Sequence, residues 1–207
     1  MNIWSLFDPF RPDCLICGLP TRQRDRPCPG CRYDLPRLPA GLPQLAGPDH
    51  VLAACAYAFP VDRLILQLKF GGRLPVARTL GLLLADAARH ADRPDLLLPV
   101  PLHPSRERER GFNQAQAIAQ VAGRELGIPV QPRALQRLRA TPAQSGLDLE
   151  HRRCNLRGAF AVGMPLPAHV ALIDDVITTG STARELAGLL HGHGVRRVAV
   201  WAVARTL

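Results

Sequence analysis

The stretch from Ala171 to Thr182, ALIDDVITTGST, constrains the fold of this chain more than any other part. Its first residues are apolar, as in a buried strand predicted over 169–174. Two acids follow, and a turn of small hydroxyl residues opens a helix predicted over 181–193. A buried strand that leads through a short turn into an amphipathic helix is typical of α/β proteins.

The same alternation extends over most of the chain. We expect further strands at 51–59, 96–100, 158–162 and 195–203, and further helices at 61–70, 75–91 and 112–126. Apolar strands that alternate with helices indicate a parallel sheet covered on both faces. We therefore predict an α/β fold with a parallel sheet flanked by helices, an arginine-rich loop before residue 112, and no clear element over 133–157.

A proline-rich segment separates this region from the amino-terminal part. Prolines occupy positions 36, 39, 43 and 48, which suits an extended linker and excludes a helix. A chain of 207 residues can bury one sizeable core and a small appendage. We predict an amino-terminal segment with its linker over 1–48 and the main domain over 49–207.

Charge and hydropathy narrow the function only coarsely. The 26 basic and 17 acidic side chains give a net charge of +9, which attracts phosphorylated small molecules, nucleic acid or acidic surfaces. Lys69 is the only lysine, so codon usage in a GC-rich genome explains the arginine excess equally well. Neither a signal peptide nor an apolar run of the roughly 20 residues that span a membrane is present. We expect a cytoplasmic protein.

Four cysteines in the amino-terminal segment form two C-x-x-C pairs, Cys14 with Cys17 and Cys28 with Cys31. Two such pairs supply four thiolates to tetrahedral zinc, and the segment has too little apolar material to fold without a metal or a crosslink. The alternatives are disulfides, which a reducing cytosol disfavours, and an iron–sulfur cluster with the same ligands. We predict a structural zinc site.

Two other cysteines stand apart from these pairs. Cys55 lies in an apolar run and fits a small core residue. Cys154 lies among arginines that could lower the pKa of its thiol, but an unreactive thiol is the simpler interpretation.

The turn after the strand at 169–174 carries the groups needed to bind a sugar phosphate. Backbone amides and hydroxyls at a helix amino terminus form a cradle for a phosphate, and Gly180 permits its close approach. Asp174 and Asp175, at the carboxyl end of the strand, suit a pair of ribose hydroxyls. The alternatives are the acid pair of a response-regulator receiver and a turn that merely caps a helix. The predicted phosphate-binding residues are Thr178, Thr179, Gly180, Ser181 and Thr182.

This stretch resembles the phosphoribosyl pyrophosphate signature of type I phosphoribosyltransferases, in which apolar residues, two acids, an apolar residue and a threonine-glycine phosphate loop follow one another. Arg106, Arg108 and Arg110 follow the predicted strand at 96–100, where guanidinium groups could hold a leaving pyrophosphate. A solvated charged loop is the alternative for any one of these arginines.

A longer set of residues resembles the ComF family of competence proteins. It comprises the four cysteines, Leu-Lys69-Phe-Gly-Gly, Pro101-Leu-His-Pro104 and Arg110-Gly-Phe-Asn-Gln114, followed by Arg139, Thr141, Gln144, Arg152 and Asn155. The resemblance covers nearly the whole chain. It implies that Lys69 contacts an anion together with the arginines, and that Mg²⁺ accompanies phosphoribosyl pyrophosphate.

Three functions follow from these resemblances. The first is a phosphoribosyltransferase-type protein linked to DNA uptake, with Asp174 and Asp175 as the catalytic pair. The second is a non-catalytic adaptor that binds single-stranded DNA or a competence helicase. The third is a regulator that senses phosphoribosyl pyrophosphate. No residue singles out an acceptor nucleophile, and fold and donor site alone do not imply turnover.

Overall fold

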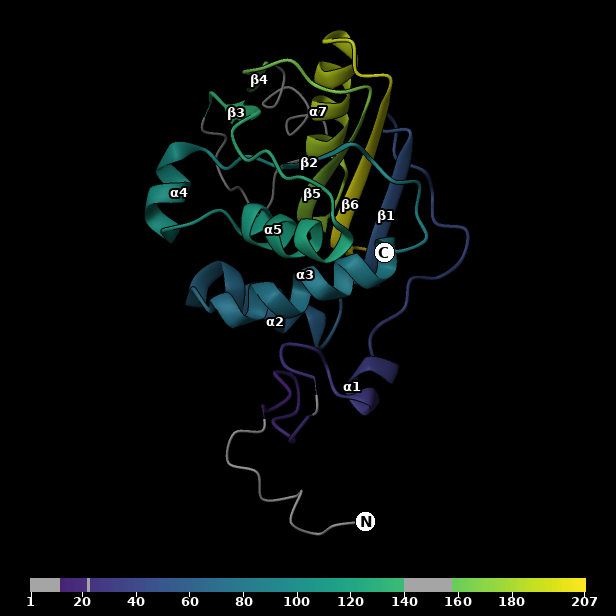
Figure 1. Ribbon diagram of the computed structural model, residues 1–207, viewed down its shortest axis with the longest axis vertical. Helices are drawn as coiled ribbons and strands as arrows, with labels where there is room; N and C mark the ends of the chain where they lie inside the picture. Colours follow the sequence, from purple (N-terminus) through teal and green to yellow (C-terminus); the bar gives the residue numbers. More distant parts are fainter. Residues whose placement is uncertain (1–11, 22, 140–157) are drawn as a thin grey trace.

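The computed structural model in Figure 1 describes residues 12–21, 23–139 and 158–207. Its centre is a parallel sheet in the order β1, β6, β5, β2. These strands are β1 (His50–Ala56), β2 (Leu96–Pro99), β5 (His169–Ile177) and β6 (Arg197–Arg205). A parallel bridge from Leu97 to Val130 extends the sheet at its β2 edge. The predicted α/β class with a parallel sheet is confirmed.

Helices cover both faces of the sheet, as the apolar strands predict. One face is covered by α2 (Val61–Gly71), α3 (Leu74–Ala88) and α5 (Gln114–Leu126), whose apolar sides form a core with Ala171, Ile173 and Trp201. The opposite face is covered by α7 (Ser181–Gly192), which packs against Leu172 and Val198. Sheet residues therefore contribute to two separate buried clusters, one on each face.

Close contact between α3 and α5 depends on glycine. A Cβ atom at Gly81 would lie 2.6 Å from Cβ of Val121 and 2.9 Å from the carbonyl oxygen of Ile118. Such distances are well below van der Waals contact, so only glycine lets the two helices approach to this separation. Helices α3 and α5 therefore form one closely packed layer.

Three elements differ from the sequence-based expectation. The arginine-rich stretch predicted as a loop forms a short helix, α4 (Pro104–Arg110), with Pro104 in its first turn and Gly111 in the left-handed conformation at its end. Strand β3 (Leu135–Arg137), where no element was predicted, pairs antiparallel with β4 (Phe160–Val162), which corresponds to the strand predicted at 158–162. Strand β5 continues past the two acids to Ile177, because Val176 and Ile177 still pair with β6.

The amino-terminal segment lies on the outer side of α3, away from the sheet (Figure 1). It contains the short helix α1 (Pro29–Tyr33) and is followed by the proline-rich segment, which runs along the β1 edge. The predicted domain boundary at residue 48 stays a prediction. In the parts of the chain that the structure describes, no helix has both the length and the apolar character needed to span a bilayer.

Candidate functional site

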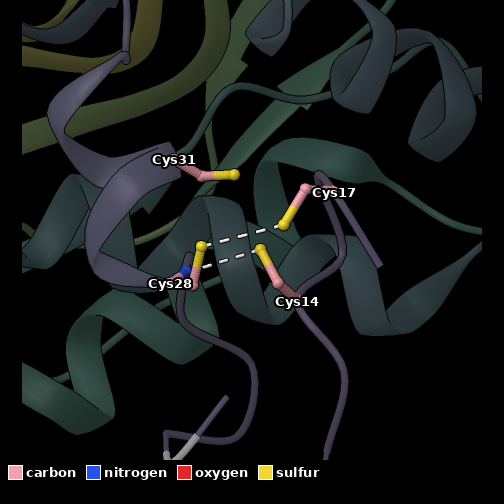
Figure 2. A group of neighbouring side chains, drawn as sticks. All are labelled: Cys14, Cys17, Cys28 and Cys31. Atoms are coloured by element: carbon pink, nitrogen blue, oxygen red, sulfur yellow. Dashed lines mark hydrogen bonds between the residues drawn. The ribbon is translucent and has the colours of Figure 1, made fainter. Parts of the chain in front are cut away.

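The four cysteines of the two C-x-x-C pairs converge, as predicted. Cys14 and Cys17 come from a loop, and Cys28 and Cys31 from the start of α1, with all four sulfurs directed to a common centre (Figure 2). The sulfur atoms all lie within 4.8 Å of one another, and Sγ of Cys17 is 3.7 Å from Sγ of Cys28. Zinc–sulfur bonds of about 2.3 Å in a tetrahedron place sulfurs roughly 3.8 Å apart. The cluster thus fits a structural metal such as zinc.

Backbone N–H groups lower the pKa of one cysteine in this cluster. Burial alone would raise the pKa of Cys14, but N–H groups of Cys28, Cys17 and Ile16 donate to its sulfur and lower the pKa to about 6. The N–H of Cys28 is 3.4 Å from this sulfur. Burial and the neighbouring sulfurs raise the pKa of Cys31 instead. One thiolate is therefore stable without metal, whereas four thiolates require a cation to offset their mutual repulsion.

An ion-pair network holds the cysteine segment against the helices. The guanidinium of Arg26 lies 2.6 Å from Asp86 on α3 and 2.7 Å from Glu125 on α5. Burial would raise the pKa of Asp86, but Arg26, Arg89 and Arg32 hold this pKa below its ordinary value. The contacts of Arg26 and Arg32 join residues far apart in sequence. The cysteine segment is thus docked on α3 and α5.

The two predicted catalytic acids lie in β5, near the carboxyl edge of the sheet. Each carboxylate accepts a hydrogen bond from the next backbone amide, Asp174 from the N–H of Asp175 at 2.8 Å and Asp175 from the N–H of Val176 at 2.9 Å. Asp175 also lies 2.7 Å from the ammonium of Lys69, which comes from the last turn of α2. The structure therefore brings Lys69 to the acid pair, although their roles toward a ligand stay predictions.

The Asp174 carboxyl differs sharply from an ordinary surface acid. Burial and repulsion from the Asp175 carboxylate raise its pKa to about 8, and the N–H of Asp175 and the Lys69 ammonium oppose this rise only in part. At neutral pH the pair consequently holds a proton on Asp174. A carboxyl that is protonated beside a carboxylate can donate to one ligand oxygen while its neighbour accepts from another.

The predicted phosphate loop joins β5 to α7. Gly180 precedes the helix with φ of +72°, a conformation that side chains rarely adopt. Within the described residues, the N–H groups of Thr179 and Gly180 have no backbone acceptor. The hydroxyl of Thr179 lies 2.9 Å from that of Ser181. Two amides without a backbone acceptor and a pair of hydroxyls thus gather at the positive end of the α7 dipole, where an anion is favoured.

The three predicted arginines separate on α4. Arg106 and Arg110, one turn apart, are half-buried, whereas Arg108 is exposed on another side of the helix. Arg110 donates to Oε1 of Gln114 at 3.2 Å and lies over the exposed ring of Phe70, 5.5 Å from its centre. Arg106 and Arg110 therefore lie against the body of the protein, whereas Arg108 is exposed to solvent.

Sequence reasoning missed Arg137, which comes from β3. Burial lowers its pKa, the charge of Arg106 lowers it further, and Asp174 opposes this change. Its guanidinium also lies over the ring of Phe160 at 5.5 Å. Arg137 is thus close enough to both an acid and an arginine of the predicted site to interact with their charges. No motif marks this residue, since it follows no recognisable strand or turn pattern.

A cavity of about 950 Å³ opens beside these groups, between α4, the start of α5 and the β3 strand. Its walls include Arg137 and Asn113, and Asn113 is held by a hydrogen bond of 3.0 Å from its side chain to the carbonyl of Val100. The remaining walls combine amide side chains with His103, Glu107, Arg133 and several prolines and leucines. Such a mixed lining suits a polar molecule of small size.

Several residues of the resemblance fall outside the described residues. These are Thr141, Gln144, Arg152 and Asn155, together with Cys154. Arg139 is described and exposed. Cys55 lies in β1 and is buried, and burial raises the pKa of its thiol to about 11. Its predicted place in the core is confirmed.

The chain is similar to known proteins over nearly its whole length. The chain is 38% identical to the DNA utilization protein YhgH of Escherichia coli K12 over 207 aligned residues, with 94% of this chain and 90% of the relative covered. The competence protein F of Haemophilus influenzae is 35% identical, with 94% and 85% covered. The chain belongs to the ComF family.

More distant ComF relatives match a smaller part. The competence protein ComFC of Streptococcus pneumoniae is 29% identical over 106 residues, or 51% of this chain and 46% of the relative. No model of a known protein family matches the chain. The ComF resemblance noted in the sequence is thereby confirmed at the level of the family.

Proposed function

We propose that this protein binds phosphoribosyl pyrophosphate with Mg²⁺ at the carboxyl edge of its sheet and acts in DNA utilization. The observation that carries the proposal is the arrangement around β5. A loop with free amides follows a strand that bears two acids, and Lys69 from another element lies 2.7 Å from Asp175. An anion cradle, a sugar-binding acid pair and a cation are thus combined at one place.

Each group has a defined task in this proposal. The loop from Thr178 to Thr182 binds the 5-phosphate, and the acid pair binds the ribose hydroxyls. The pyrophosphate is held by Lys69, by the α4 arginines Arg106, Arg108 and Arg110, and by Arg137, which the structure adds. Mg²⁺, when bound, neutralises charge on the pyrophosphate.

Transfer chemistry would occur at the anomeric carbon. The lone pair of an acceptor nucleophile forms a bond to this carbon while the carbon–oxygen bond to pyrophosphate breaks and its electrons leave with the pyrophosphate. Positive charge develops on the sugar and negative charge on the leaving group, which nearby guanidinium groups stabilise. The cavity lined by Arg137 and Asn113 is the place for the acceptor.

The biological role follows from the relatives. Proteins named for DNA utilization and for competence align with 94% of this chain at 35–38% identity. We infer that the protein works in the cytoplasm on DNA that has been taken up or is being used. Phosphoribosyl pyrophosphate is then either a substrate or a signal in that process.

Thermal unfolding with Mg²⁺ and phosphoribosyl pyrophosphate tests the binding proposal. A ligand at 100 times its Kd stabilises the folded state by about 2.7 kcal/mol, which is readily measured as a rise in Tm. We expect this rise for the natural protein and a much smaller one for Asp175→Asn. The control is Asp92→Asn, which changes an exposed ion pair with Arg197. An unchanged Tm at millimolar ligand would reject the proposal.

A second function, binding of single-stranded DNA, is favoured by a different surface. A cavity of about 560 Å³ lies between the cysteine segment and helices α3 and α5, and its lining includes Arg24, Arg78 and Arg124. Asp25 also lines this cavity and pairs with Arg78 at 2.8 Å, so Arg24 and Arg124 are the guanidinium groups that suit the phosphate backbone of a nucleic acid. The cavity is separate from the acid pair, so both functions can coexist.

Salt dependence measures this second function. Each phosphate contact contributes about 0.7 to the slope of log K against log salt concentration for a single strand. We expect Arg24→Ala with Arg124→Ala to lower the slope for an oligonucleotide by roughly one to two. The control, Arg196→Ala, removes an exposed arginine elsewhere. A slope that the double variant leaves equal to that of the natural protein would exclude this cavity as the binding surface.

A further inference from the structure

The proline-rich segment is fastened to the body of the protein at both ends. We name residues 36–49 the strap. At its start, the N–H of Ala56 donates to the carbonyl of Pro36 at 2.8 Å. At its end, Asp49 donates its N–H to the carbonyl of Val198 at 2.9 Å and accepts from the N–H of Val198 at 2.7 Å. The strap is therefore fixed to the end of β1 at one end and to the start of β6 at the other.

The middle of the strap reaches the phosphate loop. A Cβ atom at Gly180 would lie 2.8 Å from both δ carbons of Leu45, so the Leu45 side chain occupies the space beside this glycine. A Cβ at Gly47 would similarly lie 3.0 Å from Cα of Arg184, in the first turn of α7. The side chain of Arg184 also donates to the carbonyl of Ala46 at 3.4 Å. The strap thus contacts the loop and the helix that follows it.

These contacts are made by an apolar side chain on one flank of a polar loop. Leu45 is partly buried and packs against the core formed by α7, whereas Gln44 beside it is exposed. Prolines 43 and 48 flank this part of the strap and restrict its backbone, which reduces the entropy lost when it orders. A stiff strap with a methyl pair against Gly180 limits how far the loop can move toward it.

We propose that Leu45 is a positioning residue for the phosphate loop. Its side chain holds Gly180 in place, so the amides of Thr179 and Gly180 keep the orientation in which they meet an anion. This inference rests on the proposed function, because it assigns the strap a task in binding the 5-phosphate. It also predicts that the strap affects the 5-phosphate and leaves pyrophosphate binding unaffected.

Calorimetric titration of the full chain separates these effects. The probes are ribose 5-phosphate, which the loop would bind, and pyrophosphate with Mg²⁺, which the cationic side chains would bind. We expect Leu45→Ala to weaken the binding of ribose 5-phosphate about tenfold, which is the effect expected when one charge-assisted hydrogen bond is misaligned. Pyrophosphate affinity should stay within about twofold in the same variant. Leu45→Met should restore ribose 5-phosphate binding, and the matched control Gln44→Ala should leave both affinities unchanged.

The outcomes distinguish the strap from the proposed function. Equal weakening of both probes in Leu45→Ala, or no weakening of either, overturns the positioning role. If the natural protein binds no ribose 5-phosphate, the proposed function fails and hydrogen exchange decides on the strap. Faster exchange of the amides from 179 to 184 in Leu45→Ala, with unchanged exchange in α5, then upholds the positioning role. Unchanged exchange in the loop overturns it.

Discussion

Replacing Cys17 by serine is expected to abolish stoichiometric metal binding. The natural protein should be purified with one metal equivalent per chain, since the four sulfurs already lie at separations that a tetrahedral ion requires. Structural zinc sites of this kind contribute roughly 10 to 16 kcal/mol of binding free energy, and this energy holds a segment with little apolar core. Loss of one of four thiolates should therefore lower metal affinity by several orders of magnitude.

Metal analysis and limited proteolysis measure this result. We expect the Cys17→Ser protein to contain little metal and to be cut rapidly between residues 12 and 34, whereas the main domain stays resistant. Cys55→Ala is the matched control, because Cys55 is buried in β1 and lies outside the cluster. If the natural protein showed visible absorbance from iron, the site would be assigned to an iron–sulfur cluster instead of zinc. Full metal content in Cys17→Ser would refute the four-cysteine site.

Replacing Lys69 by methionine is expected to destabilise the protein in a strongly pH-dependent way. The Lys69 ammonium lies 2.7 Å from Asp175 and also lowers the pKa of Asp174, which burial and Asp175 raise from 3.8 to about 8. Removing one partner of a largely buried ion pair leaves an uncompensated charge and costs about 3 kcal/mol. In Lys69→Met, the pKa of Asp174 should therefore rise further.

The sign of the pH effect follows from proton uptake. The folded protein keeps the Asp174 proton up to about pH 8, whereas the unfolded chain loses it near pH 4, so the unfolding free energy falls between these values. Up to about pH 8 both folded proteins keep the Asp174 proton, so this group adds no pH dependence to the stability difference between them. Above pH 8 the natural protein releases this proton while the variant, with its higher pKa, keeps it, so the difference should widen and be largest near pH 9.

Urea unfolding at pH 4.5 and pH 9 checks this expectation. Lys69→Arg keeps the positive charge and should recover most of the stability at pH 9. Combining Lys69→Met with Asp175→Asn removes the repelling carboxylate and should reduce the pH dependence. A loss of stability in Lys69→Met that is the same at both pH values would mean that the lysine acts through packing of its methylene chain.

The sequence predicted the sheet and its covering helices well because their signals are local. Runs such as Leu96 to Val100 are apolar throughout, and the helix at Gln114 to Leu126 has one apolar side. The four-cysteine cluster and the loop before α7 could also be predicted from the sequence, because their residues are close together in it. Spacing alone fixed which cysteines could meet.

The missed features depend on contacts between distant residues. Arg137 approaches the site because β3, which carries it, lines the same cavity as α4. Helix α4 was predicted as a loop because its seven residues are nearly all polar and show no apolar periodicity. The place of Leu45 against Gly180 is a tertiary contact between segments about 135 residues apart, which no local pattern encodes.

The order of strands in the sheet bears on how the chain can assemble during synthesis. Strand β6 comes last in the described chain yet lies between β1 and β5. The edge strand β1 therefore has no neighbouring strand until residues near 205 have left the ribosome. His50, for example, pairs with Ala199, which is synthesised about 150 residues later. The cysteine segment emerges before the strands of the sheet and can take up metal at once. Until β6 arrives, β1 must be protected from pairing with other chains.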